Sequence, residues 1–333
     1  MKYILPALLI LLSLATTHLA AENNPTDRKA TTADTSLDQP QRDRKKRTPW
    51  PVRVLRLIGV VAGIYVCFIL VLFLLKDRFI YHPIRHPRGN WEQPALHVED
   101  CTFGTSDGLR LHAWWRPAED PDHAPTLLWF HGNAGNLTHR AENLSMIPRS
   151  VNVLLVDYRG YGKSQGHPTE KGLYLDGEAA YRYLTEERDI EPDHIIAYGR
   201  SLGTAVALQV ATEREVAGLI LESPFRSAGA MAHHMFPFIP GRLMLPGVFD
   251  NAARIGNLEV PLLVIHGRKD RIVPFKQGRA LYDQAPEPKR FHPLPHAGHN
   301  DTYAAGGPDY FPTITGFARD CVNTPLPTGK DQP

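Results

Sequence analysis

Short runs of apolar and β-branched residues alternate with helix-like stretches after residue 95, and this alternation constrains the fold most strongly. The stretches 170–188 and 202–213 are typical of helices, and Ser106, Asp107 and Gly108 predict a turn. We therefore expect an antiparallel hairpin that leads into a mostly parallel sheet of about eight strands, with helices on both faces. The candidate strands are LHVEDCTF, LRLHAWW, TLLWFH, VNVLLVDY, HIIAYG, AGLILES, PLLVIHG and RFHPL.

The first 90 residues differ in composition from the rest and hold two apolar segments. Residues 1–21 combine Lys2 with a short apolar centre and end in Ala20 and Ala21, a pattern typical of a secretory signal. A polar and basic linker follows at 22–53. The sequence therefore places the start of the globular part well after the N-terminus.

The second apolar segment, residues 57–75, carries no charged side chain. As a helix it would be roughly 28 Å long, close to the ~30 Å hydrocarbon core of a bilayer. A buried helix of a soluble protein is the alternative, but such a helix rarely stays apolar on every side over this length. We predict a transmembrane helix over 54–76 that anchors the chain in a membrane.

Basic residues flank this segment unequally, which bears on its orientation. Under the positive-inside rule the excess on the N-terminal side favours a cytoplasmic N-terminal side and an extracytoplasmic large domain. Export of the linker by residues 1–21 would give the opposite orientation. We expect the large domain to be extracytoplasmic. The seven preceding and four following basic residues are Arg42, Arg44, Lys45, Lys46, Arg47, Arg53 and Arg56, then Lys76, Arg78, Arg85 and Arg88.

Composition excludes some classes of function. The 333 residues are 43% hydrophobic and carry a net charge of +2, so the chain can bury a sizeable core but has no basic face for nucleic acid. The three cysteines lack CxxC spacing, which argues against a zinc site. Cys101 and Cys321 could pair in an oxidising compartment, although two buried free thiols are the more common arrangement.

The stretch AYGRSLGTA puts Ser201 between Gly199 and Gly203, after one candidate strand and before a candidate helix. This is the context of a nucleophile elbow, in which bulk at either neighbour would collide with the flanking strand and helix. Serines between glycines also occur in ordinary turns. A nucleophilic serine needs a base and an acid as partners, so those partners decide between the two interpretations.

Asp270 follows the strand PLLVIHG and His299 follows RFHPL, so both lie where the carboxyl ends of parallel strands gather. The order Ser201, Asp270, His299 is the one expected for this architecture. Rivals for the acid are Glu222 and Asp250. His296 is the rival for the base.

Backbone donors for a negative oxygen are the fourth part of such a site. The turn HGNAG, residues 131–135, follows a strand, so the N–H of Asn133 could join that of Leu202. We expect His131 to brace this turn. His233 and His234 are adjacent and therefore point apart on a helix, which argues against a metal pair.

With these residues in place, the chain resembles the α/β-hydrolase superfamily, in the membrane-tethered branch that includes protein depalmitoylases and bud-emergence-type homologues. The likeness runs over residues 79–317 and implies a serine hydrolase of ester or thioester bonds without metal or organic cofactor. His296 departs from the pattern, because a small residue is expected there. The sequence motifs that carry the resemblance are RFIYHP (78–83), FHGNAGN, DYRGYGKSQG (157–166), GRSLG, LESPF (221–225), FDNAARI (249–255), HGRKDRIVP and GHND.

We therefore predict an α/β-hydrolase domain over 77–325, with a C-terminal tail at 326–333. A short cap at 226–260 is rich in Met and aromatic residues, which suits a lipid-like or other small acyl ester substrate. The cap could instead only cover the helical layer. The leading hypothesis is a membrane-anchored serine esterase or thioesterase; a serine peptidase or a tethered binding module with a vestigial site are the alternatives. The oligomeric state stays open.

Overall fold

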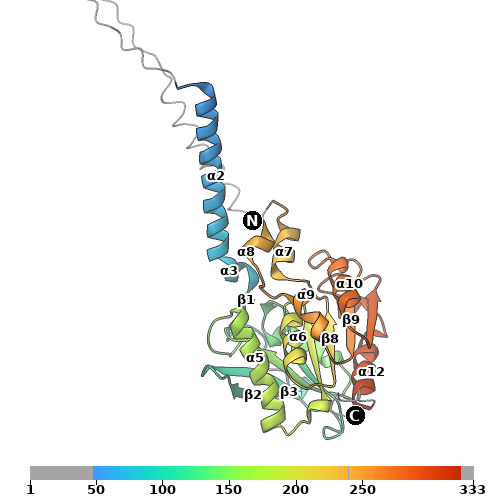
Figure 1. Cartoon of the computed structure of the whole chain (residues 1–333). Coiled ribbons are helices and arrows are strands. Elements are labelled where there is room, and N and C mark those ends of the chain that lie inside the picture. Colours follow the sequence, from blue (N-terminus) through green and yellow to red (C-terminus); the bar gives the residue numbers. More distant parts are fainter. Residues whose placement is uncertain (1–47, 239, 324–333) are drawn as a thin grey trace, which may run out of the picture. The chain divides into compact units, whose positions relative to one another are not determined.

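The computed structural model describes residues 48–238 and 240–323 (Figure 1). The predicted signal segment, the linker up to residue 47 and the tail at 326–333 lie outside these residues. The strands are β1 (His82–Pro83), β2 (Glu99–Gly104), β3 (Arg110–Arg116), β4 (Thr126–Phe130), β5 (Ala134–Gly135), β6 (Asn152–Asp157), β7 (Ile195–Arg200), β8 (Gly218–Glu222), β9 (Leu262–Gly267) and β10 (Lys289–Leu294). The α-helices are α2 (Trp50–Leu74), α3 (Lys76–Ile80), α4 (Ala141–Met146), α5 (Glu170–Arg182), α6 (Gly203–Glu213), α7 (Ala228–Met235), α8 (Gly241–Met244), α9 (Asn251–Arg254), α10 (Phe275–Gln284), α11 (Thr302–Ala305) and α12 (Tyr310–Asn323).

Eight strands form one sheet in the order β10-β9-β8-β7-β4-β6-β3-β2. The strands from β10 to β6 run parallel, whereas β3 is antiparallel to β6 and β2 is antiparallel to β3. The expected α/β fold, with its leading hairpin and mostly parallel sheet, is confirmed. A second, two-stranded sheet pairs β1 with β5 and has no counterpart among the candidate strands of the sequence.

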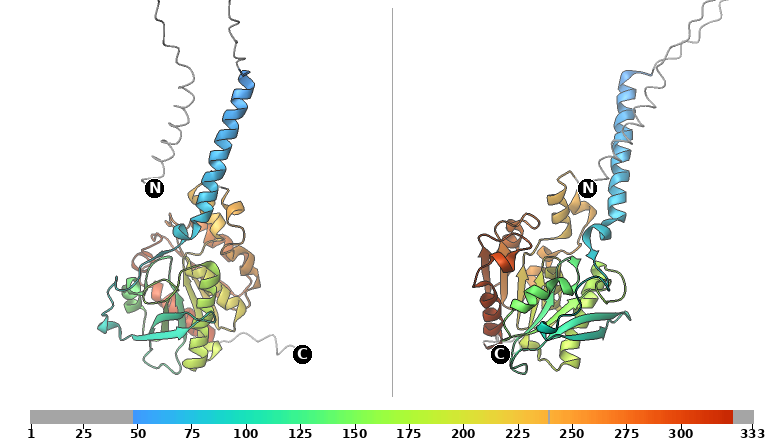
Figure 2. Two further views of the ribbon diagram at one scale, coloured as in Figure 1. Left: turned by 90° about the vertical axis from the view of Figure 1, so that its left-hand side faces the viewer. Right: turned by 180° about the vertical axis from the view of Figure 1, so that it is seen from behind.

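The central strands are buried on both faces, as their continuous apolar runs require. Along β4, Leu128 and Phe130 join one core cluster, and Leu127 and Trp129 join the other. The first cluster includes α5 and α6, and the second includes α12, so these helices cover opposite faces of the sheet (Figure 2). This layering leaves the carboxyl edge of the parallel strands to the loops that carry the candidate site.

Local signals explain where the helices begin. The side chain of Thr169 accepts a hydrogen bond from the N–H of Gly172 and caps α5, and Ser227 caps α7 in the same way through the N–H of Ala230. The predicted helix over 170–188 consists of α5 up to Arg182 and a π-helical segment over Tyr183–Glu187, so the residues after Arg182 are not α-helical.

Helix α2 is long and apolar enough to cross a membrane, with a mean hydropathy of 3.0 and none of its apolar window buried. This conclusion follows from the length and composition of the helix, which a membrane anchor and a signal sequence share. The helix covers most of the predicted span 54–76 and begins four residues before it, at Trp50.

Candidate active site

Ser201 lies in a tight turn between β7 and α6 and has a φ of 52°, in the left-handed region. A Cβ on Gly199 would lie 2.3 Å from the carbonyl oxygen of Gly203, and one on Gly203 would lie 2.1 Å from that of Phe130. Only glycine fits at these two positions, because a side chain would collide with the neighbouring backbone. The turn thus presents the Ser201 hydroxyl at the carboxyl end of the sheet under backbone strain.

The structure brings Ser201, His299 and Asp270 into one chain of hydrogen bonds. His299 Nε2 lies 3.1 Å from Ser201 Oγ, and His299 Nδ1 lies 2.7 Å from Asp270 Oδ2. The three residues follow β7, β10 and β9, respectively, so they meet where the strands end. This is the geometry by which a carboxylate orients an imidazole and the imidazole accepts the proton of a hydroxyl.

Asp270 is held as an anion by several donors. Its Oδ1 accepts the N–H groups of Ile272 and Val273, and His266 Nε2 lies 3.4 Å from its Oδ2. Burial alone would raise the pKa of this carboxyl, but the hydrogen bonds from His266 and His299 outweigh burial and hold the pKa well below its usual range. Asp270 therefore stays ionised and able to accept from His299 Nδ1.

The loop after β4, residues 131–135, lies beside Ser201; we call it the β4 loop. A Cβ on Gly132 would be 3.5 Å from Ser201 Cβ. Within residues 48–238 and 240–323, the backbone N–H groups of Asn133 and Leu202 enter no hydrogen bond. An oxyanion formed at Ser201 would require two such free backbone donors directed at it.

Comparisons with known proteins agree with this architecture. The chain is 33% identical over 290 residues to protein bem46 of Schizosaccharomyces pombe, covering 82% of this chain and 96% of the relative. It is 31% identical over 281 residues to the alpha/beta hydrolase domain-containing protein WAV2 of Arabidopsis thaliana, covering 77% and 91%. This chain belongs to the α/β-hydrolase superfamily.

Two further matches are weaker evidence for the family, one because it covers a short segment and the other because its sequence identity is low. A family model described as Chlamydia CHLPS protein (DUF818) matches residues 136–218 of this α/β-hydrolase. The structure of the Pyrococcus furiosus esterase Pf2001 superposes with a TM-score of 0.59 at 21% identity, over 72% of this chain and 99% of the esterase. At that identity the likeness shows the fold.

The rival residues of this α/β-hydrolase lie elsewhere. His296 is exposed, whereas His299 faces Ser201. Asp250 caps α9 through the N–H of Ala253. Glu222 is fully buried and receives hydrogen bonds from Tyr198, Arg200 and Thr302 instead of from an imidazole.

Two supporting residues were missed from the sequence. His266, four residues before Asp270, bonds the carbonyl of Val273 as well as approaching Asp270. Arg200, the residue before the serine, joins Glu222 through Nε and donates from Nη2 to the carbonyl oxygen of His299 at 2.6 Å. Both residues lie in recognised motifs, HGRKD and GRSLG, but a histidine or arginine at a strand end can make many different contacts. Residue type and position therefore do not predict these two.

The cap carries α7, α8 and α9, and it exposes Met235 and Phe238. His233 and His234 are exposed on α7. No cluster of metal-binding side chains occurs among the described residues. The cap therefore exposes apolar side chains, Met235 and Phe238, beside polar ones, His233 and His234.

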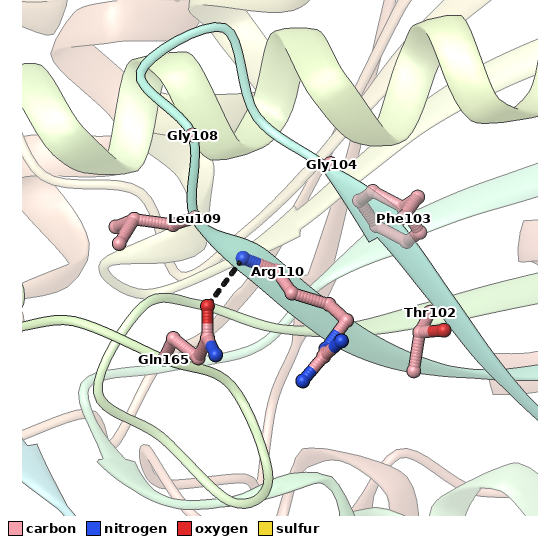
Figure 3. Close-up of a pocket in the computed structure, with 7 residues that line it drawn as sticks. All are labelled: Thr102, Phe103, Gly104, Gly108, Leu109, Arg110 and Gln165. Atoms are coloured by element: carbon pink, nitrogen blue, oxygen red, sulfur yellow. Dashed lines mark hydrogen bonds between the residues drawn. The ribbon is translucent and has the colours of Figure 1, made fainter.

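Cys101 and Cys321 are free and buried, and they belong to the core clusters on opposite faces of the sheet. A separate depression of about 350 Å³ lies at the β2–β3 hairpin (Figure 3). There the N–H of Arg110 donates to Gln165 Oε1 at 2.9 Å. None of the residues that line this depression belongs to the Ser201 site, so we assign it no role in that site.

Proposed function

We propose that this chain is a membrane-anchored serine hydrolase that cleaves carboxylic ester or thioester bonds. The observation that carries the proposal is the continuous hydrogen-bonded path from Ser201 Oγ through His299 to the ionised Asp270. A turn residue without chemical purpose would have no reason to meet two partners from separate strand ends. Helix α2 supplies the proposed anchor, with the hydrolase domain outside the cytoplasm.

The proposed reaction has two halves. In the first, His299 Nε2 accepts the proton of Ser201 while Oγ attacks the acyl carbonyl, and the N–H groups of Asn133 and Leu202 donate to the resulting oxyanion. His299 then returns the proton to the departing alcohol or thiol, which leaves an acyl-enzyme. In the second half a water attacks the acyl group while His299 Nε2 accepts its proton, and His299 then gives that proton to Ser201 Oγ as the acyl–oxygen bond breaks and the acid leaves. Asp270 keeps Nδ1 protonated throughout.

Two observations support an acyl ester as substrate. The cap exposes Met235 and Phe238, whose side chains suit an acyl chain better than a polar peptide. Solved neighbours of the same fold, from Pyrococcus furiosus and Rhodothermus marinus, are described as esterases. The proposed substrate is therefore a small or lipid-like acyl ester.

Hydrolysis of p-nitrophenyl butyrate by the full chain in detergent tests the proposal. We expect Ser201→Ala to lower kcat by at least about 10³-fold, because the nucleophile is lost. Ser145→Ala is the matched control, since the Ser145 hydroxyl bonds only the carbonyl of Glu142 in its own helix. Undiminished activity in Ser201→Ala would reject the mechanism. Preference for dipeptidyl amides would favour a peptidase, and inactivity of the wild type towards both substrates would favour a binding module.

A further inference from the structure

The segment Ile80–Ile84, which we call the strap, runs along the β4 loop. It follows α3 directly and contains β1, which pairs in parallel with β5. The N–H of His82 donates to the carbonyl of Asn133 at 3.0 Å, and the N–H of Ile84 donates to that of Gly135 at 2.9 Å. The strap falls mostly within the motif RFIYHP, to which the Ser201 chemistry assigns no part.

Asn133 is fixed on its side chain and on both flanking peptide planes. Its Nδ2 donates to the carbonyl of Ile80 at 2.9 Å, and its own carbonyl accepts from His82 N and from the Tyr161 hydroxyl, the latter at 2.7 Å. On the other side, His131 Nδ1 lies 2.6 Å from the carbonyl oxygen of Gly132. In a trans peptide the N–H of Asn133 points away from that carbonyl, so these contacts together set its direction.

Other contacts hold the two ends of the β4 loop, because the Tyr158 hydroxyl donates to the His131 carbonyl and Arg140 Nη2 donates to the Ala134 carbonyl. Asn133, between these ends, is held by the strap and Tyr161. Strand β5 has two residues, and Gly132 and Gly135 give the loop a flexible backbone. An oxyanion donor works only when it is oriented before the charge develops, since reorientation during the reaction forfeits its advantage. Tyr81 anchors the strap, because its side chain is buried and packs edge-on against Phe249.

We propose that the strap, together with the Tyr161 hydroxyl, positions the N–H of Asn133 for the oxyanion, so that the residues following the apolar helix support catalysis in addition to linking it to the domain. The inference rests on the proposed serine hydrolase function. Ile80, His82 and Tyr161 are positioning residues, because they act through Asn133 rather than on the substrate.

Two variants of the full chain test this inference. Tyr161→Phe removes one hydrogen bond to the Asn133 carbonyl, and Asn133→Ala removes the side-chain bond to Ile80. We expect each to lower kcat for p-nitrophenyl butyrate roughly five- to tenfold with KM unchanged, as for loss of a transition-state interaction. Tyr181→Phe is the matched control, since its hydroxyl makes a similar bond to the Glu215 carbonyl at the other end of the sheet. That control should keep wild-type kcat.

Hydrogen exchange of the peptide covering residues 130–137 provides a second readout that does not depend on activity. Exchange there should accelerate in both variants and stay at the wild-type rate in Tyr181→Phe. Unchanged kcat and unchanged exchange in both variants, with Ser201→Ala inactive, would overturn the strap inference and leave the hydrolase intact. A rise in KM alone would also overturn it. A wild type that hydrolyses no ester would reject the hydrolase function and the catalytic role of the strap, and exchange would then show only whether the strap orders the loop.

Discussion

Replacing Arg200 by Gln should destabilise the domain because it leaves a buried carboxylate without its cation. Arg200 and Glu222 are both buried, and Arg200 Nε lies 3.1 Å from Glu222 Oε1. Breaking a buried ion pair by removing one partner costs about 3–5 kcal/mol. At about 2–4 °C per kcal/mol for a domain of this size, Tm should fall by roughly 6–20 °C.

Acidification should reduce this difference. In the wild type, burial raises the pKa of Glu222, but the Arg200 charge and the hydrogen bonds from Thr302 and Tyr198 outweigh burial and lower it. The wild-type contribution is thus present above the unfolded pKa of about 4.3 and is lost as pH falls through the folded value. In Arg200→Gln we expect burial to dominate and to raise the pKa of Glu222 above its unfolded value, so the stability of the variant should fall as pH rises from about 4.3 towards that raised pKa. The two proteins should therefore differ most at neutral pH.

Thermal unfolding of the full chain in detergent between pH 4 and 8, followed by circular dichroism, measures both effects. Arg214→Gln is the matched control, because its pair with Glu178 lies near the surface and should contribute at most about 1 kcal/mol. The kcat of Arg200→Gln should also fall, since the His299 carbonyl loses its donor. Equal Tm values for Arg200→Gln and Arg214→Gln, or a difference that grows on acidification, would refute the reasoning.

Three other predictions follow from the site and the chain. Asp270→Asn should lower kcat by about 10⁴-fold with little change in KM, because His299 loses the acceptor that fixes its tautomer; near wild-type kcat would contradict this role. Gly203→Ala should destabilise the domain by at least about 1–3 kcal/mol in urea unfolding through its clash with the carbonyl of Phe130, whereas Gly316→Ala in α12, which has open space, should be neutral or stabilising. Protease added to intact cells should digest the hydrolase domain if it is extracytoplasmic, and full protection would reverse the proposed orientation.

The fold could be predicted because its signals are local and repeated. Continuous apolar runs such as those of β4 and β6 predict a sheet that is buried on both faces. Gly199 and Gly203 predict a sharp turn between a strand and a helix. Ser201, Asp270 and His299 each follow a predicted strand, and this position alone predicts that they meet at one edge of the sheet. These inferences need only periodicity and the rule that functional loops gather at carboxyl ends.

The supporting contacts could not be predicted, because they join residues far apart in the chain through backbone atoms. Arg200 donates to the His299 carbonyl, and Asn133 donates to the Ile80 carbonyl. Any residue has a backbone carbonyl, so the residue types at these positions do not predict the bonds. Glu222 illustrates the same limit. Its position at a strand end made it an alternative to Asp270 as the acid of the site. Its burial and its hydrogen bonds from Tyr198, Arg200 and Thr302 indicate a structural role.

Covalent labelling by a fluorophosphonate tests the central claim most directly, because this reagent reacts readily only with an activated serine. The full chain in detergent is treated with the probe, digested and mapped by mass spectrometry. We predict one phosphonyl adduct, on Ser201, which is absent in Ser201→Ala and forms much more slowly when His299 is replaced by Ala. A wild type that stays unlabelled, or equal labelling of the Ser201→Ala variant, would contradict the account.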